Sequence, residues 1–594
     1  MRLRLLRLRF RRRFRIGQRQ VGSLGSQTEK NFDRHFVKRL GNLTAPVRRF
    51  VTTWVLLLVL LVGALFVQNI ALGGYYQQLR PVPGGIYNEG MLGTFTNANP
   101  LYATSDVDTS ISKLLFSGLF TYDNHNKLVG DLAQNYSVDK TNTIYTVHLK
   151  SGLTWQDGQP LTSADVVFTY QTIQDPDAQS PLRDSWQNIT ISAPDSHTVT
   201  FKLPGTLASF PYTMTNGIVP KHILERVPAV RLRSADFNTV RPVGAGPFAW
   251  QAIQVSGNDP SVAEEQIALV PFGNYGRGAP KVREFIVHVY ASSARLTRAF
   301  RSGQLTGAAG LSGVPDNIKG MDSLEAHSPL LTAENMVFFK TSGGLLSDAN
   351  VRQALVEGTD RHAIIKNLGY PTHAVREPFL MGQLGYNASL TQSGPNLPAA
   401  RKLLDKDGWK MGKDGIRSKA GQELSFTLTA ADTPEYRMVT RQLHDQWKDI
   451  GVGLKVAMQD SSDFQNTLTY HNYDAILYGI SIGPDPDVLV YWDSSQADAR
   501  SSTRLNLSEY KNVIADSSLE AGRSRLDPAL RAVKYKPFLE EWQKDYPALG
   551  LYQPRYLYLT NGPVAGLSDN AINSAANRFD NVQNWEIREA RVTD

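Results

Sequence analysis

Cysteine is absent from all 594 residues of the sequence. Its absence excludes disulfide bonds, thiolate metal sites and cysteine nucleophiles. It also excludes a membrane anchor that depends on an acylated cysteine. Outside the cytoplasm such a protein is stabilised by its hydrophobic core alone, and a chain of this length is long enough to form two or three lobes.

Motifs of catalysis and nucleotide binding are also absent. The eleven histidines form no HExxH motif, and neither a GxSxG elbow nor a GxxxxGK(S/T) loop occurs. We therefore expect no catalytic residues, no metal site and no cofactor, and a membrane-anchored hydrolase is the less favoured alternative. Any ATP-driven partner must be a separate chain.

The excess of positive charge is confined to the N-terminal tail. Residues 1–50 contain 13 Arg and 2 Lys but only two acidic residues, Glu29 and Asp33, so their net charge is +13. Because the whole chain has a net charge of +8, the remaining residues have a net charge of −5. An acidic body is not typical of nucleic-acid binding, and we expect no nucleic-acid partner. The Arg, Leu and Phe of residues 1–20 suit contact with anionic lipid, or serve only as a topology signal.

Only one long apolar run occurs, VTTWVLLLVLLVGALFVQNIAL at residues 51–72, and it contains no charged residue. As a helix it is about 33 Å long, enough to cross the hydrocarbon layer. Arg48 and Arg49 precede it, so the N-terminus is expected in the cytoplasm and the body outside the cell membrane, behind a single span. A cleaved signal peptide is the alternative, although the run is long and the preceding tail unusual for one.

The body is predicted to mix strands and helices. Residues 145–150 and 198–203 alternate apolar and polar side chains, which is typical of half-buried strands. Helices are expected to begin after Thr162, Thr359 and Thr433, whose hydroxyls suit the N-cap. This mixture predicts α/β lobes.

Several segments carry a likeness to a known family. They are GGIYNEG (84–90), NANPLY (97–102), LLFSGLFTYD (114–123), the stretch 128–170 that begins LVGDLAQNYS, PVGAGPF (242–248), NVRQALVEGTDRHAIIKNLGY (350–370), LPAARKLLDKDGW (397–409) and YDAILYGISIGPDPDVLVYWDSSQ (473–496). In this order the segments resemble solute-binding protein family 5, the extracytoplasmic receptors of oligopeptide and dipeptide ABC importers.

The resemblance implies an α/β, bilobal periplasmic-binding-protein fold of type II, with an extra subdomain, behind the N-terminal transmembrane helix. The implied divisions are a cytoplasmic tail (1–50), the helix (51–72), a linker (73–83) and a solute-binding domain (84–594), the last divided into lobe I (84–115, 205–285 and 556–594), an extra subdomain (116–204) and lobe II (286–555).

The resemblance also implies a function without catalysis. The chain would bind a peptide or peptide-like ligand between its lobes and deliver it to the permease and ATPase subunits of an ABC importer. A ligand-sensing receptor of the same fold is the alternative.

By resemblance, Tyr478, Gly479, Ile480 and Ser481 correspond to the strand that pairs with the ligand backbone. Ligand contacts are also expected from Trp492 and Asn97. Many relatives have an aspartate directly after the strand that meets the ligand's amino group, and this chain has Ile482, Gly483 and Pro484 there. Asp485 and Asp487 follow, and they either replace that aspartate or cap the next helix.

The charge step across residues 51–72 makes a prediction about topology. Protease added to intact cells should digest the body, because positively charged flanks stay in the cytoplasm. A reporter fused ahead of Arg2 should stay protected. A body that resists protease until the cells are lysed would contradict both the membrane span and a role in import.

Overall fold

The computed structural model describes residues 48–257, 264–501 and 503–593, and the basic tail predicted at residues 1–50 lies almost entirely outside them. The chain divides into two compact units, residues 1–80 with 589–594, and residues 81–588. The first unit contains the helix α3 (Arg48–Tyr76). Within it, Phe50–Ile70 has a mean hydropathy of 2.7 and is long and apolar enough to cross a membrane.

The segment predicted as a linker, residues 73–83, is more ordered than expected. The helix continues to Tyr76, and the strand β1 (Gln77–Val82) follows directly. β1 pairs with β23 (Arg588–Thr593) in a two-stranded sheet. Backbone pairing with a distant segment gives no local signal in the sequence, which is why the linker prediction was wrong here.

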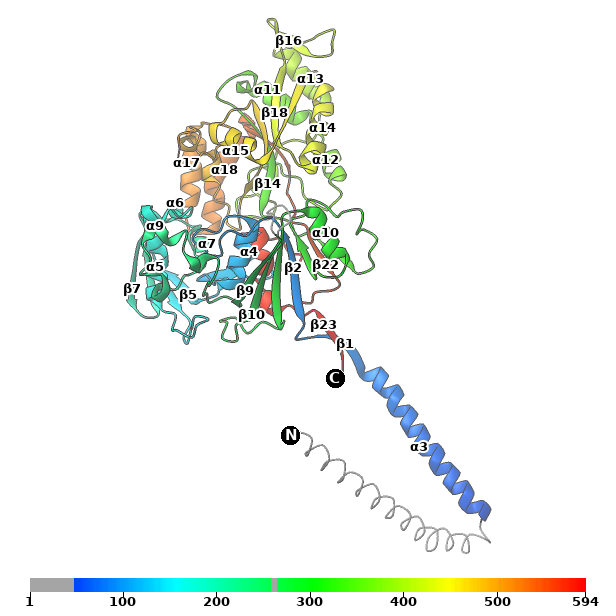
Figure 1. The fold of residues 1–594 in the computed structure, drawn as a ribbon. Coiled ribbons are helices and arrows are strands. Elements are labelled where there is room, and N and C mark those ends of the chain that lie inside the picture. The colour runs from blue at the N-terminus through cyan, green and yellow to red at the C-terminus, as the bar shows by residue number, and fades with distance from the viewer. Residues whose placement is uncertain (1–47, 258–263, 502, 594) are drawn as a thin grey trace. The chain divides into compact units, whose positions relative to one another are not determined.

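The body contains two large sheets, each with its own helices (Figure 1). The first has seven strands in the order β13-β22-β12-β2-β11-β10-β9. Their bounds are β2 (Ile86–Leu92), β9 (Phe248–Ser256), β10 (Glu264–Pro271), β11 (Glu284–Tyr290), β12 (Gly307–Ala309), β13 (Leu324–His327) and β22 (Tyr558–Asn561). The helices α4 (Asp106–Leu115) and α10 (Ser293–Arg301) belong to this part, which we call lobe I.

The second sheet defines lobe II and has the order β19-β18-β20-β14-β21. Its strands are β14 (Ala333–Phe339), β18 (Ser425–Ala431), β19 (Gly453–Gln459), β20 (Ala475–Ser481) and β21 (Ala548–Tyr552). The helices with it include α11 (Ala349–Glu357), α12 (Arg361–Leu368), α13 (Leu397–Lys406), α14 (Pro434–Lys448), α15 (Ser461–Tyr470), α16 (Leu489–Trp492), α17 (Val513–Arg523) and α18 (Pro528–Asp545).

The predicted start of lobe II at residue 286 is wrong. β11, β12 and β13 all pair within the first sheet, so the chain enters lobe II only after His327. It crosses at residues 328–332 and returns at residues 553–557. Strand pairing decides lobe membership, and short strands such as β12 and β13 leave little pattern in the sequence.

A smaller four-stranded sheet lies within the range assigned to the extra subdomain, 116–204. Its order is β5-β6-β8-β7, and the bounds are β5 (Ala133–Val138), β6 (Ile144–Leu149), β7 (Thr190–Asp195) and β8 (Thr198–Lys202). A hairpin of β3 (Phe120–Tyr122) and β4 (Leu128–Gly130) and the helix α5 (Ser163–Gln174) accompany it. β6 and β8 confirm the two strands predicted from alternation.

Two of the three predicted helix caps are confirmed. Thr162 and Asp165 form a capping box at the start of α5, and Thr433 accepts a hydrogen bond from the Tyr436 amide at the start of α14. At α12 the cap is Asp360, not Thr359. The Thr359 hydroxyl is buried instead, donating to the Leu355 carbonyl and accepting from the indole of Trp447.

A buried polar network joins the first strand of lobe I to the end of the chain. The Glu89 carboxylate, on β2, accepts hydrogen bonds from Arg578 at 2.8 Å and from the Tyr558 hydroxyl at 2.6 Å, and Tyr558 also contacts the Tyr87 hydroxyl at 2.6 Å. Glu89 is fully buried. A side chain at Gly307 would collide with this network, since a Cβ there would lie 2.4 Å from the Tyr558 hydroxyl.

Replacing Arg578 by methionine should destabilise the protein by about 3–5 kcal/mol, because Glu89 would remain buried without its cation. The free energy of unfolding in urea measures the change. Lys319→Met breaks the exposed ion pair with Asp316 and should have little effect. Equal losses in the two variants would contradict this role of the buried pair.

Candidate functional site

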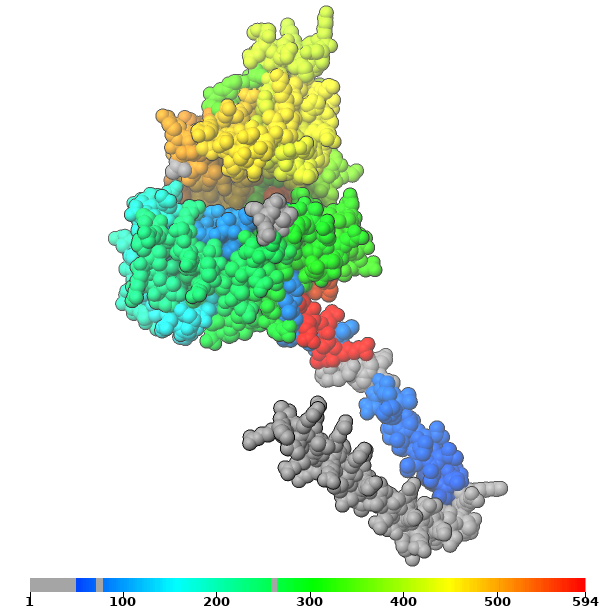
Figure 2. All heavy atoms as spheres, in the orientation of Figure 1, coloured from blue at the N-terminus to red at the C-terminus, as the bar shows by residue number. Residues whose placement is uncertain are grey.

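The carboxyl ends of the strands of both lobes meet at the crossing segments. β13 leads into the first crossing, and β2, β11 and β12 run in the same direction as β13. In lobe II, β18 and β20 run parallel to each other, and both run antiparallel to β14. The carboxyl ends of β18 and β20 therefore lie at the end of the sheet where β14 begins. This edge of an α/β sheet is where ligands bind. The surface is hollowed between the two lobes here (Figure 2).

The last part of β20 has an open edge facing this region. β20 pairs with β14 along its whole length, from Ala475 to Ser481. Its pairing with β18 covers only residues 475–477. Among the described residues, no strand pairs with Tyr478–Ser481 on that side, so main-chain groups remain available for an added strand.

A small polar group adjoins the open edge. Asn335 lies opposite Gly479 in the strand register, and its side-chain oxygen accepts a hydrogen bond of 3.1 Å from the Tyr436 hydroxyl. Glu435, at the start of α14, accepts from the hydroxyls of Tyr552 and Tyr370. Gly479 has no room for a side chain, because a Cβ would lie 2.6 Å from the Asn335 oxygen.

Asp485 and Asp487 cap no helix. α16 begins at Leu489 and has no side-chain cap. Asp485 instead forms two hydrogen bonds with Arg531, at 2.6 and 2.7 Å, and both side chains are buried. Asp487 pairs with Arg523 at 3.0 Å and accepts from the Ser209 hydroxyl at 2.9 Å. Both carboxylates therefore already have cationic partners within the protein.

A cavity of about 790 Å³ lies between the small four-stranded sheet and lobe II. Aromatic side chains line one side and the buried ion pair lies on the other; the residues that matter most are Phe120, Tyr136, Tyr145, Tyr212, Pro484, Asp485 and Arg531. Burial raises the pKa of Tyr145 to about 12, so its hydroxyl stays protonated and donates to the Leu207 carbonyl. The cavity therefore offers aromatic faces and few free charges.

Two of the predicted ligand contacts are structural residues. Trp492 is 0% exposed and lies in the core of lobe II, stacked on Phe338. The Asn97 side chain is almost fully buried and accepts a hydrogen bond from the Asn99 amide within a turn. In this conformation neither residue has surface to offer a ligand, which corrects both predictions.

Sequence reasoning missed Arg531 and Tyr136, which line the cavity, and Glu334, which is buried in lobe II. Arg531 and Tyr136 are far in sequence from the predicted strand, and only the fold brings them to the cavity. Glu334, in contrast, has a local signal in the sequence, because an acidic residue near the start of the apolar run ENMVFF is unusual for a strand buried on both faces. That signal was enough to single out Glu334 as a buried charge, although the predictions made from the sequence did not use it.

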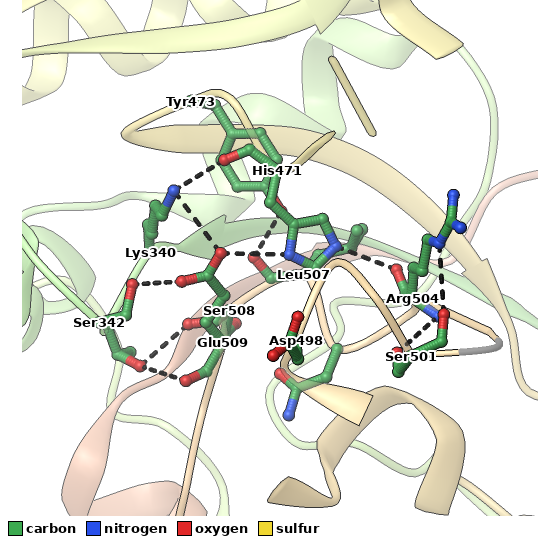
Figure 3. A network of polar contacts seen from close by, with 12 residues as sticks. Lys340, Ser342, His471, Tyr473, Asp498, Ser501, Arg504, Leu507, Ser508 and Glu509 are labelled. Atoms are coloured by element: carbon green, nitrogen blue, oxygen red, sulfur yellow. Dashed lines mark hydrogen bonds and ion pairs between the residues drawn. The ribbon is translucent and has the colours of Figure 1, made fainter. Parts of the chain in front are cut away.

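A second polar cluster, at the other end of the lobe II sheet, has a different arrangement from a catalytic triad (Figure 3). The imidazole of His471, almost fully buried, contacts the Glu509 carboxylate at 3.2 Å and the Arg504 carbonyl at 3.1 Å. The Ser342 hydroxyl donates to Glu509 and not to His471. In this cluster the histidine therefore activates no hydroxyl, and Lys340 pairs with Glu509 at 3.5 Å.

Comparison with known proteins gives a consistent picture. The model of bacterial extracellular solute-binding proteins, family 5, middle region, matches residues 127–501. The oligopeptide-binding protein AppA of Bacillus subtilis is 26% identical over 496 residues, which is 80% of this chain and 87% of that protein. Protein XP55 of Streptomyces lividans is 29% identical over 460 residues, 75% of this chain and 78% of that protein.

Solved structures share the fold. AppA of Bacillus subtilis in complex with a nonapeptide superimposes with a TM-score of 0.68 at 24% identity, over 86% of this chain and 100% of that chain. NikZ of Campylobacter jejuni in complex with Ni(L-His) gives a TM-score of 0.72 at 22% identity, over 84% and 99%. The neighbours thus hold unlike ligands on one bilobal fold.

The pairing of Asp485 makes a prediction about stability. Asp485→Asn should destabilise the protein by about 3–5 kcal/mol, since Arg531 would stay buried without its carboxylate. The double variant with Arg531→Met should regain part of that loss. Asp498→Asn, which breaks an exposed pair with Arg500, is the matched control and should leave the urea midpoint unchanged. An unaltered midpoint for Asp485→Asn would contradict the assignment.

Proposed function

The chain belongs to family 5 of the bacterial extracellular solute-binding proteins, and from this premise we propose that it binds a peptide or peptide-like solute between its lobes and delivers it to an ABC importer. Relatives named as ABC transporter peptide-binding proteins support the proposal. The observation that carries it is the open edge Tyr478–Ser481 at the carboxyl ends of the strands.

An open strand edge suits a ligand of variable sequence. A peptide added alongside β20 satisfies its own main-chain N–H and C=O groups with those of the strand, whatever its side chains are. Those groups need partners once the lobes enclose them and exclude water. The cavity of about 790 Å³ beside Pro484 and Asp485 gives room for side chains against aromatic faces.

The helix α3 supports a membrane-anchored form of the receptor. The window Phe50–Ile70 is strongly apolar and contains no charged residue, and Arg48 and Arg49 lie at its N-terminal end. We propose that this helix holds the body at the outer face of the cell membrane with the N-terminus in the cytoplasm. The ligand would then be captured next to the permease.

Gly479→Val tests the strand-pairing site. The valine should weaken binding of peptides by about 1–3 kcal/mol, because its side chain displaces the Asn335 amide beside the open edge and leaves polar groups of edge and ligand unpaired. The measurement is retention of peptides from a protein digest by the full chain, followed by titration with a retained peptide.

The matched control is Gly343→Val in the same lobe, where a Cβ meets open space. Circular dichroism must show that both variants fold. A folded Gly479→Val variant with unchanged affinity would place the ligand elsewhere in the cleft.

A further inference from the structure

Lobe II contains two buried carboxyl groups without a cation. Glu334 is the second residue of β14 and is 0% exposed, and neither of its carboxyl oxygens has a hydrogen-bond partner among the described residues. Glu377 is also 0% exposed. One of its oxygens accepts from the Asn387 amide at 2.8 Å, and the other has no partner in the described part of the chain.

The two carboxyl groups affect each other. Burial raises the pKa of Glu334 well above its usual range, and the charge of Glu377 raises it further. Burial raises the pKa of Glu377 to about 8, against the smaller opposing effect of the Asn387 amide. The Tyr491 hydroxyl, which donates to the Ser481 carbonyl, is within the electrostatic influence of Glu334.

Their position links them to the proposed binding edge. Glu334 lies opposite Ile480 in the register of β14 and β20. Strand alternation puts its side chain on the same face as Met336 and Phe338, which pack in one core cluster with Ile480. Glu334 therefore lies on the opposite face of the sheet from Gly479 and Asn335, directly behind the open edge.

Segments next to the two carboxyl groups in sequence are tied to the crossing between the lobes. The Thr332 carbonyl, two residues before Glu334, accepts from the amides of Ile482 and Gly483. The Thr332 hydroxyl donates to Asn573 of lobe I at 2.8 Å. Gln383, close to Glu377 in sequence, donates to the Gly483 carbonyl at 2.7 Å. The segments on either side of the pair are therefore linked to both lobes.

Within the part of the chain that the structure describes, this pair has no cationic partner. In residues 48–257, 264–501 and 503–593, no lysine, arginine or histidine forms an ion pair with Glu334 or Glu377, whereas Asp485 and Asp487 each have an arginine. A buried carboxylate without a cation or hydrogen bonds is costly, so it is either protonated or paired with a cation from outside the chain.

We propose that Glu334 and Glu377 together receive one cationic group of the ligand, an ammonium or a guanidinium. This inference rests on the proposed function and narrows it to basic peptides and peptide-like amines. Without ligand, each of the two carboxyl groups holds a proton and the pair is neutral. When the cationic group enters, one of the two protons leaves to solvent and the ligand's charge takes its place, while the other carboxyl group stays protonated.

The test uses the detergent-solubilised full chain and synthetic hexapeptides in three matched forms. One form has a free amino terminus, one is acetylated, and one is acetylated with a single lysine or arginine. Retained peptides are identified by mass spectrometry. Cationic forms should be enriched at least about tenfold over the acetylated neutral form.

Glu334→Gln and Glu377→Gln, tested separately, should lose that enrichment and still retain neutral peptides, because an amide keeps the shape and removes the charge. Two separate variants guard against a failure of one to fold. Glu540→Gln, on the exposed side of α18, is the control and should select peptides as the wild type does.

The outcomes separate the two proposals. Peptides retained without preference for cationic forms, or a preference that survives in both Gln variants, would overturn this assignment and leave the proposed function intact. Failure of the wild type to retain any of the peptides would overturn the proposed function and this assignment with it.

Discussion

The buried ion pair between Glu89 and Arg578 is the constraint on which lobe I depends. It joins the first strand of the body to the segment near its end, two parts of the chain separated by 489 residues. An unpaired Glu89 would be costly in this dry interior, so β2 and the C-terminal segment are stable only together. The Tyr558 hydroxyl donates to the carboxylate and contacts the Tyr87 hydroxyl, and Gly307 leaves both tyrosines space.

The chemistry of the cleft follows from which of its acids have partners. Asp485 and Asp487 are neutralised by arginines of α18 and α17, so they fix the position of those helices against the end of β20. Glu334 and Glu377 have no such partner. The same lobe thus contains two acids that are paired with arginines and two buried acids that have no cationic partner among the described residues.

Sequence reasoning was most successful where a structure depends on neighbouring residues. The capping box of Thr162 and Asp165, the start of α14 at Thr433 and the alternation in β6 and β8 are local patterns, and the structure confirms them. It failed where distant partners decide. Asp485 was read as a possible cap because Arg531, 46 residues later, gives no local sign of its position. Trp492 lies in one of the segments that resemble the family and was predicted to contact the ligand, yet it packs in the core of lobe II.

Lobe II is topologically an insertion into a hairpin of lobe I. His327, the last residue before the chain leaves, and Tyr558, the first strand residue after it returns, are register partners in β13 and β22. During synthesis β22 emerges from the ribosome only after the whole of lobe II, so β12 has no partner on this side until then. The entropic cost of closing a loop grows only slowly with the length of the loop. The long insertion therefore delays the pairing of β12 with β22 more than it lowers the stability of the sheet. Until then the nascent sheet exposes an unpaired edge, to which another strand can pair.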